Sequence, residues 1–351
     1  MKPRKQLLTT FSVLLITALL VACVSPPAAP VSPSAQPTVT PIPPTPVPPT
    51  PEPSTGATAK TSAVAEAQLE PHQPRPDAPP YGVRGSYAVG VRDFVIDSPE
   101  RKIPVTVWYP AQNPEATEEA VTYTMNFLAD PAAGFPTGGR ALRDAAPDPS
   151  GGAYPLVLYS HGAWVFPAIA GFFAEHLASH GFVVMAAVHE DNWGTLFESV
   201  YKSEISRPQD MVRQLDFAED LTAPKGEMAG LIDMEHVAVT GQSFGGTIAL
   251  EMGGARLNLA EWQKTFCVEF PEDEDCKAYP AHFKEMATLA GLEAVPEGLW
   301  PDWSDPRIDV VVATAPGVSM LGGGGLDGMR RPIMLLNGTN DNMVGPELEY
   351  R

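Results

Sequence analysis

The sequence predicts an α/β domain in which helices cover both faces of a doubly wound, mostly parallel sheet. Strand-like and helix-like segments alternate from residue 86 onward in the 351-residue chain. The later strand-like segments are short, continuous apolar runs, as expected of strands buried on both faces. Near residue 243 a strand, a Gly-x-Ser-x-Gly turn and a helix follow one another directly. This alternation is typical of parallel α/β sheets.

The first two strands are predicted as an antiparallel pair. Residues 86–95 and 102–109 are rich in β-branched and aromatic residues, and a turn-forming segment at 97–100 separates them. A Gly/Pro-rich stretch follows. Further strands are then predicted at 156–160, 182–188, 236–240, 308–313 and 333–336.

Helices are predicted between these strands, at 167–180, 206–221 and 244–252. The first has Phe172, Phe173, His176 and Leu177 on one face, and Gly181 ends it. The apolar stripe of the second is formed by Met211, Val212, Leu215 and Phe217.

Residues 236–250 contain the motif with the clearest chemistry. A serine in a turn from a buried strand into a helix adopts a strained backbone, so its neighbours must lack side chains that would collide. Gly241, Gly245 and Gly246 meet that requirement around Ser243. The hydroxyl is then exposed at a helix N-terminus, where the helix dipole favours developing negative charge. The motif predicts Ser243 as a catalytic nucleophile.

This motif belongs to a wider pattern. Together with residues 159–164 (Tyr-Ser-His-Gly-Ala-Trp) and 187–191 (Ala-Val-His-Glu-Asp), it resembles the α/β-hydrolase superfamily. Within the superfamily the chain is similar to bacterial platelet-activating-factor acetylhydrolase-like, dienelactone-hydrolase-like and polyester-hydrolase-like proteins. The resemblance implies an α/β-hydrolase fold and a serine carboxylic-ester hydrolase that works through an acyl-enzyme on Ser243. It implies no metal and no organic cofactor, and the substrate is expected to be a small-molecule, lipid or polyester ester.

The resemblance also assigns an oxyanion hole. Its donors are the backbone N–H groups of Ala163 and Phe244, the second of which directly follows the nucleophile. His161 is expected to shape the turn rather than act as a base. Trp164 and Trp193 follow strand ends and are candidates for an acyl-pocket wall, although such a tryptophan alone is more often a packing residue than a substrate contact.

The triad acid is assigned to Asp341. In the family the orienting carboxylate commonly sits three residues after a glycine such as Gly338, at the end of a late strand. The alternative is an aspartate that satisfies only its own turn.

The base is not found where the family has it. No histidine follows Asp341, and the C-terminal strand and helix that would present one are missing from the sequence. We therefore expect the chain to be an incomplete copy. Two alternatives remain: a base from elsewhere, for which His189 is the best candidate, or a non-catalytic, surface-tethered binding lipoprotein. A peptidase or acyltransferase on the same fold is a further alternative.

The N-terminal part predicts export. Residues 1–22 form a basic and then apolar signal peptide that ends in Leu-Val-Ala before Cys23, a sequence that resembles the bacterial lipobox. We expect Cys23 to be lipidated and to anchor the protein on the extracytoplasmic face of a bacterial membrane; an ordinary secretory signal is the alternative. Residues 23–80, rich in proline and threonine, are predicted to be a disordered spacer before a domain at 81–351.

Charge and cysteines limit the partners. The chain has a formal net charge of −19, which argues against nucleic acid. An insertion at about 255–305 interrupts the strand–helix alternation and is either a cap over the site or an inert excursion. It contains Cys267 and Cys276, for which a disulfide is expected outside the cytoplasm, with two free thiols as the alternative. No spacing typical of a zinc site occurs.

Overall fold

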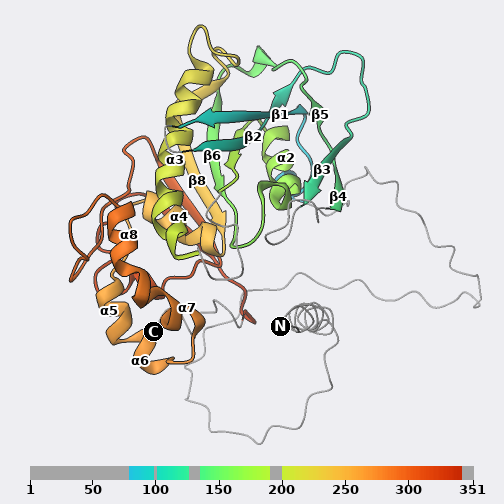
Figure 1. The fold of residues 1–351 in the computed structure, drawn as a ribbon. Helices are drawn as coiled ribbons and strands as arrows, with labels where there is room; N and C mark the ends of the chain where they lie inside the picture. Colours follow the sequence, from blue (N-terminus) through green and yellow to red (C-terminus); the bar gives the residue numbers. More distant parts are fainter. Residues whose placement is uncertain (1–78, 99–100, 126–134, 190–199, 342–351) are drawn as a thin grey trace, which may run out of the picture. The chain divides into compact units, whose positions relative to one another are not determined.

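The computed structural model describes residues 79–98, 101–125, 135–189 and 200–341, which fall within one compact unit, Leu69–Arg351. Its centre is an eight-stranded sheet with the order β10-β9-β8-β6-β7-β2-β1-β5 (Figure 1). The strands are β1 (Ala88–Asp97), β2 (Lys102–Ala111), β5 (Leu142–Arg143), β6 (Tyr154–Ser160), β7 (Val183–Ala187), β8 (Ile232–Gln242), β9 (Val310–Thr314) and β10 (Ile333–Leu336). A separate two-stranded antiparallel sheet pairs β3 (Val121–Met125) with β4 (Phe135–Gly139).

The sheet is mostly parallel, as predicted. Strands β7, β6, β8, β9 and β10 are all parallel to their neighbours in this series. Strands β1 and β2 form the predicted antiparallel pair, and β2 joins the parallel strands through an antiparallel pairing with β7. The α/β fold class predicted from the sequence is therefore confirmed.

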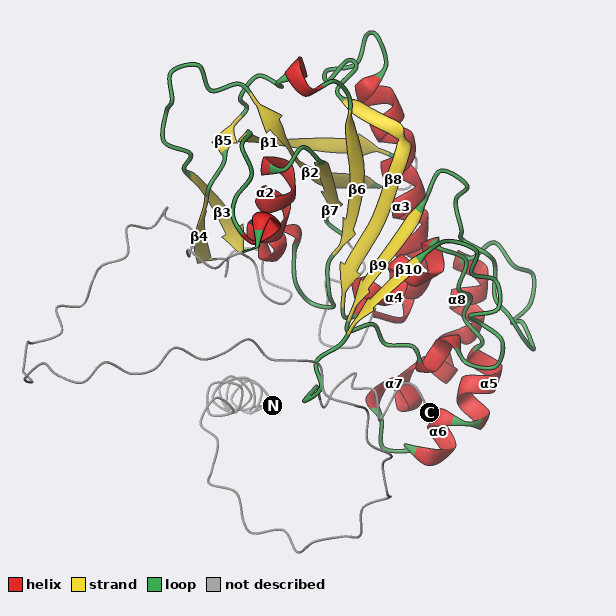
Figure 2. Ribbon diagram, turned by 180° about the vertical axis from the view of Figure 1, so that it is seen from behind, coloured by secondary structure: helices red, strands yellow, loops and turns green. Residues whose placement is uncertain are grey.

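Helices cover both faces of this sheet (Figures 1 and 2). Helices α3 (Val200–Thr222) and α4 (Phe244–Met252) lie on one face, whereas α2 (Gly171–Ser179), preceded by the 3-10 helix η4 (Pro167–Ala170), packs on the other. The burial pattern of β7 shows why both faces are apolar. Met185 packs in the α3 and α4 core, while Val184 packs in the α2 core, because successive strand residues point to opposite faces.

The packing face of α2 differs from the one predicted. Phe172 is 78% exposed, while Ala174 and Ala178 are fully or almost fully buried. The small side chains let the helix backbone approach β1, β2 and β7 closely, so they and not the phenylalanine form the contact.

The insertion forms a helical group next to the strand ends toward which β6, β8, β9 and β10 point (Figure 2). It contains α5 (Leu259–Lys264), α6 (Phe266–Glu269), α7 (Glu274–Ala278), η6 (Tyr279–His282) and α8 (Phe283–Leu289). Trp262, Tyr279 and Trp300 are almost completely buried and belong to the main core. A disulfide joins Cys267 and Cys276, in agreement with the expectation. The insertion is therefore part of the domain core and not an inert excursion.

Remaining short elements are η1 (Pro80–Gly82), η3 (Pro149–Gly151) and η7 (Ser319–Leu321). The predicted signal peptide, Cys23 and the predicted spacer up to residue 78 lie outside the described residues, as does Trp193. Among the described helices, none combines the length and apolar character that a membrane span requires.

Candidate active site

Ser243 lies in a strained turn between β8 and α4. Its backbone angles are φ +56° and ψ −127°, a region that a non-glycine residue adopts only where its surroundings enforce it. Its N–H donates to the carbonyl of Thr314 on β9 at 2.9 Å, and its carbonyl accepts from Gly246 N–H at 2.8 Å. The turn is thus fixed from the neighbouring strand and from the helix that follows.

The two flanking glycines allow this turn to pack against β6. A Cβ on Gly245 would lie 1.9 Å from the carbonyl oxygen of Ser160. A Cβ on Gly241 would lie 2.2 Å from the carbonyl oxygen of Gly245. Both contacts involve backbone atoms that cannot move aside, so only glycine fits either position.

Ser243 opens into a cavity of about 280 Å³. Ala163 and Phe244 line this cavity, so the structure brings both predicted oxyanion residues to the predicted nucleophile. Within the described part of the chain, neither of their N–H groups donates a backbone hydrogen bond. The rest of the wall consists of Trp164, Val200, Glu204, Thr247, Trp262, Phe266, Asp273, Asp275, Tyr279, Gly317, Ser319 and Met320.

Backbone strain gathers around this cavity. Besides Ser243, positive φ angles occur at Trp164 (+59°), directly after Ala163, and at Ala315 (+45°), directly after the residue that accepts the Ser243 N–H. Residues held in such conformations cost about 1–3 kcal/mol each and cluster at functional sites. The strain therefore points to the same location as the sequence motif.

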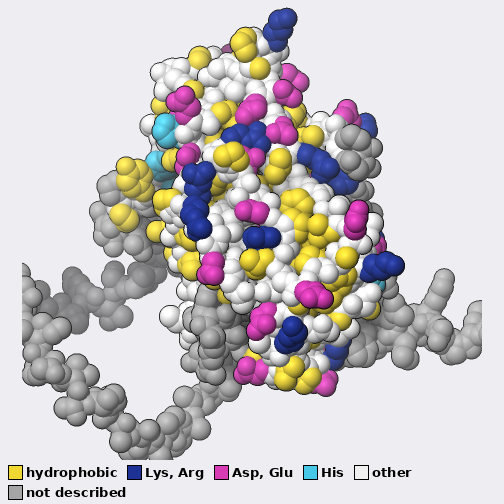
Figure 3. Space-filling view, turned by 90° about the vertical axis from the view of Figure 1, so that its left-hand side faces the viewer, with side chains coloured by type: hydrophobic (Ala, Val, Ile, Leu, Met, Phe, Trp, Pro, Cys, Tyr) yellow, Lys and Arg dark blue, Asp and Glu magenta, His cyan; other side chains and the backbone are white. Residues whose placement is uncertain are grey.

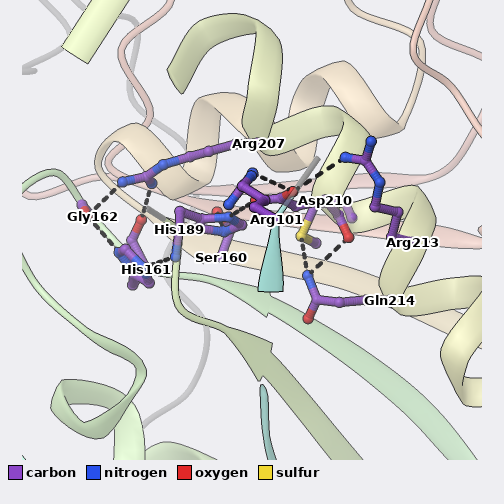
Figure 4. A network of polar contacts seen from close by, with 10 residues as sticks. Arg101, Ser160, His161, Gly162, His189, Arg207, Asp210, Arg213 and Gln214 are labelled. Atoms are coloured by element: carbon purple, nitrogen blue, oxygen red, sulfur yellow. Dashed lines mark hydrogen bonds and ion pairs between the residues drawn. The ribbon is translucent and has the colours of Figure 1, made fainter. Parts of the chain in front are cut away.

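Arg207 of α3 contacts both segments that the sequence predicts to form the oxyanion hole. Its fully buried guanidinium donates to the carbonyl oxygen of His161 at 2.6 Å and to that of Gly162 at 3.4 Å. The same guanidinium lies 4.4 Å from the centre of the Phe244 ring, a cation–π distance. Figure 4 shows the contacts of Arg207 with His161 and Gly162. One side chain thus contacts both the turn before Ala163 and the ring of Phe244.

His161 and His189 belong to a buried hydrogen-bond network (Figure 4). His189 donates from Nδ1 to Asp210 Oδ2 at 2.9 Å, and its Nε2 is 3.4 Å from Ser160 Oγ. Asp210 also accepts from Arg101 at 2.5 Å. His161 Nδ1 is 2.8 Å from the carbonyl oxygen of Gly162, and its Nε2 accepts from the N–H of His189.

This environment keeps both histidines neutral. Burial lowers the pKa of His161 well below its usual value, and Arg207 and then His189 lower it further. Burial likewise lowers the pKa of His189, with added contributions from Arg207 and Arg101. Neither histidine lines the Ser243 cavity. The structure therefore gives no support to His189 as a base and assigns His161 to the architecture of the turn.

Asp341 lies in the turn after β10, where its N–H donates to the carbonyl of Gly338 at 3.1 Å. It does not line the Ser243 cavity within the described part of the chain. The preceding strand is half exposed, with Ile333, Met334 and Leu335 between 42% and 56% exposed.

Sequence reasoning missed the polar face of α3. Ser203, Arg207, Asp210 and Gln214 are all fully buried and recur at helical spacing. This recurrence was a usable signal, since a polar stripe beside an apolar one on the same helix indicates a buried network or a site. Glu204, next to this stripe, reaches the cavity wall.

A second cavity, of about 550 Å³, lies over β1 and β2 and contains none of the predicted site residues. In the described part of the chain no group of three or more His, Cys, Asp or Glu side chains is arranged to hold a metal ion. On the face shown in Figure 3, acidic and basic side chains are interspersed and do not form one basic area.

Comparisons with known proteins agree with this geometry. Residues 124–264 match the chlorophyllase family model. Platelet-activating factor acetylhydrolases from Canis lupus familiaris (24% identity, 48% of this chain and 50% of the relative) and Cavia porcellus (26%, with 35% of each chain) are similar to this chain. The chain spans half or less of the length of these curated relatives. A solved ferulic acid esterase from Streptomyces cinnamoneus aligns at 18% identity over 75% of this chain and 69% of that one, with a TM-score of 0.43.

The sheet order and the strained serine between β8 and α4 fit an α/β-hydrolase fold, and the chlorophyllase and acetylhydrolase matches agree with it. Among ester-hydrolysing proteins, the chain is similar to platelet-activating factor acetylhydrolases.

Proposed function

We propose that this protein is a serine carboxylic-ester hydrolase that works through an acyl-enzyme on Ser243. The observation that carries the proposal is the convergence of a strained serine with the residues of two unengaged backbone N–H groups, Ala163 and Phe244, in one cavity. Similarity to acetylhydrolases supports ester substrates.

The geometry suggests how these groups would act. Attack by Ser243 Oγ on an ester carbonyl places negative charge on the carbonyl oxygen, and the N–H groups of Ala163 and Phe244 would receive that charge. The N-terminus of α4 adds the positive end of its dipole at the same point. Each fixed donor of this kind contributes on the order of 3 kcal/mol to the transition state. The proton of the Ser243 hydroxyl passes to a general base, which this proposal does not assign to a residue, and then to the leaving oxygen, so that collapse expels the alcohol and leaves the acyl group on Ser243. Water, deprotonated by the same base, then attacks the acyl-enzyme, releases the acid and restores the hydroxyl.

The decisive experiment compares the wild-type protein with a variant at the proposed nucleophile. Ser243→Ala should abolish cleavage of short-chain p-nitrophenyl esters and labelling by a fluorophosphonate probe, because both need the hydroxyl. Ser304→Ala, at an exposed serine away from the cavity, serves as the control and should retain both. Ester cleavage by the alanine variant at the wild-type rate would refute the proposal. Assaying matched peptide amides alongside separates an esterase from a peptidase.

We further propose that the protein is exported and lipid-anchored through Cys23. The support is the order of a basic segment, an apolar segment and Leu-Val-Ala-Cys at residues 20–23. Cys23→Ser should remove incorporation of radiolabelled palmitate and shift the protein from the membrane fraction to the soluble one. Retention of the label in that variant would exclude this anchor.

A further inference from the structure

Two polar atoms at the wall of the Ser243 cavity, one on Glu204 and one on Trp262, have no hydrogen-bond partner among the described residues. Glu204 of α3 is 4% exposed and lines the cavity; its Oε2 has no hydrogen-bond partner in the described part of the chain. Its Oε1 has only a long contact, 3.5 Å, from the hydroxyl of Tyr279. Trp262 of α5 lines the same cavity, and its buried indole N–H is also without a partner there. Buried polar atoms are nearly always paired, so two unpaired ones at one cavity wall indicate a ligand.

The charge state of Glu204 determines what it offers to that ligand. Burial raises the pKa of Glu204 to about 8, and the Asp275 charge raises it while Arg207 lowers it. Burial, and then the nearby Glu204, also raise the pKa of a second buried carboxyl, Glu251 on α4. At neutral pH Glu204 is therefore mostly a neutral carboxylic acid, which donates a hydrogen bond. The indole N–H is a donor only.

We infer that Glu204 and Trp262 form a specificity subsite that donates hydrogen bonds to an uncharged oxygen of the ester substrate, such as an ether, hydroxyl or carbonyl oxygen. The inference rests on the proposed function of Ser243 and names the class of ester that the site takes. Asp273 and Asp275 on the same wall oppose a carboxylate in that position. The rest of the wall includes the apolar side chains of Val200, Phe266 and Met320, so a plain alkyl chain fits there but leaves both donors unpaired.

The test measures binding rather than turnover, with two uncleaved amides of matched shape. N-benzyl-3-methoxypropanamide differs from N-benzylpentanamide only in an oxygen that replaces a methylene group. At pH 6.5 the wild-type protein should bind the methoxy compound roughly 3- to 10-fold more tightly, the value of one or two net hydrogen bonds. Ligand-observed NMR titration gives both dissociation constants.

Variants and a pH series then show which residues cause the preference for the methoxy compound. Glu204→Met, which keeps similar volume without a donor, should reduce the ratio to about 1 or below, and Trp262→Phe should reduce it partly. Glu204→Gln should keep the ratio because its amide still donates. In the wild type the ratio should fall as pH rises through about 8, where the carboxyl ionises, and in Glu204→Gln it should be independent of pH. Glu269→Met, at an exposed glutamate of the same insertion, is the matched control and should behave as wild type.

Two outcomes would overturn the subsite: an equal affinity of the wild type for the two amides, or a preference that does not change between pH 6.5 and 9.5. The pH series needs no variant, so it still decides if Glu204→Met fails to fold. Because no step depends on Ser243, loss of this preference would leave the esterase proposal intact. Conversely, unchanged ester cleavage by Ser243→Ala would leave the measured preference standing as a binding property.

Discussion

The two parts of the predicted catalytic machinery are built very differently. Around Ser243, the turn is closed by hydrogen bonds to β9 and α4, the flanking glycines touch backbone, and buried Arg207 fixes the oxyanion turn. Around Asp341, by contrast, the structure shows a half-exposed strand and one backbone hydrogen bond within the turn. The nucleophile side is thus closely packed against neighbouring backbone, whereas the strand that leads to Asp341 is half exposed. Mutations on the two sides should therefore separate stability from activity.

The largest effect is expected on the acid side, in activity alone. If Asp341 orients the base, Asp341→Asn should lower kcat by about 10⁴-fold, as loss of the orienting carboxylate does in serine hydrolases. The melting temperature should stay nearly unchanged, because Asp341 lies in a turn of an exposed edge. Ester kinetics and thermal melts on the same samples check both parts. A fall in kcat of less than tenfold would leave Asp341 as a turn residue only.

On the nucleophile side, substitution of a flanking glycine should lower the stability of the fold. Gly245→Ala places a Cβ 1.9 Å from the Ser160 carbonyl and should cost about 3 kcal/mol or more in unfolding free energy, since backbone must shift. The counterpart is Gly338→Ala, whose nearest contact would be the Asp341 Cβ at 3.6 Å, an ordinary distance. That variant should stay within about 0.5 kcal/mol of wild type. Urea denaturation of both gives the contrast, and equal losses would contradict it.

Arg207 is the next test of how the nucleophile side is fixed. Arg207→Lys retains the charge but cannot hold two carbonyl oxygens and the Phe244 ring in the same way. We expect kcat to fall roughly 10- to 100-fold with little change in KM, because small displacements of oxyanion donors affect the transition state. Arg331→Lys, at an exposed arginine before β10 that contacts the Pro306 carbonyl, should stay within about twofold. An effect on KM alone would place Arg207 in substrate binding instead.

The same contrast explains what the sequence could predict. Every strand of the parallel series and the helix after Ser243 were found, because apolar runs and the glycine pattern around the turn are local signals. The buried polar stripe of α3 was missed, since Glu204 and Arg207 look like solvent-facing residues until α4 and the insertion enclose them. The exposure of Phe172 was missed for a related reason: close packing on the sheet selects the small Ala174 and Ala178. The helical spacing of the α3 stripe was visible in the sequence, but which elements enclose it, and which face of α2 meets the sheet, are tertiary contacts that no local pattern contains.

The smallest predicted effect concerns the stability of the nucleophile side. Glu251 lies on α4 with both carboxyl oxygens unpartnered in the described part of the chain, and burial raises its pKa well above the usual value. When the pKa of a carboxyl is higher in the folded state than in the unfolded state, its contribution to stability is complete below the unfolded-state pKa. This contribution is lost as the pH rises through the folded-state pKa. Glu251→Gln should therefore match wild type at pH 4 and be more stable at pH 8, by about 1–2 kcal/mol.

Thermal melts at the two pH values measure this difference, with each kcal/mol worth roughly 2–4 °C in a domain of this size. Glu293→Gln, at an exposed glutamate of the insertion, is the control and should show no pH-dependent gain. A gain for Glu251→Gln that is equal at pH 4 and pH 8 would mean that improved packing, and not the ionisation of a buried acid, stabilises the variant. A pH-dependent gain would show that ionisation of the buried Glu251 carboxyl lowers the stability of the nucleophile side. This is also the side on which Glu204 lines the Ser243 cavity.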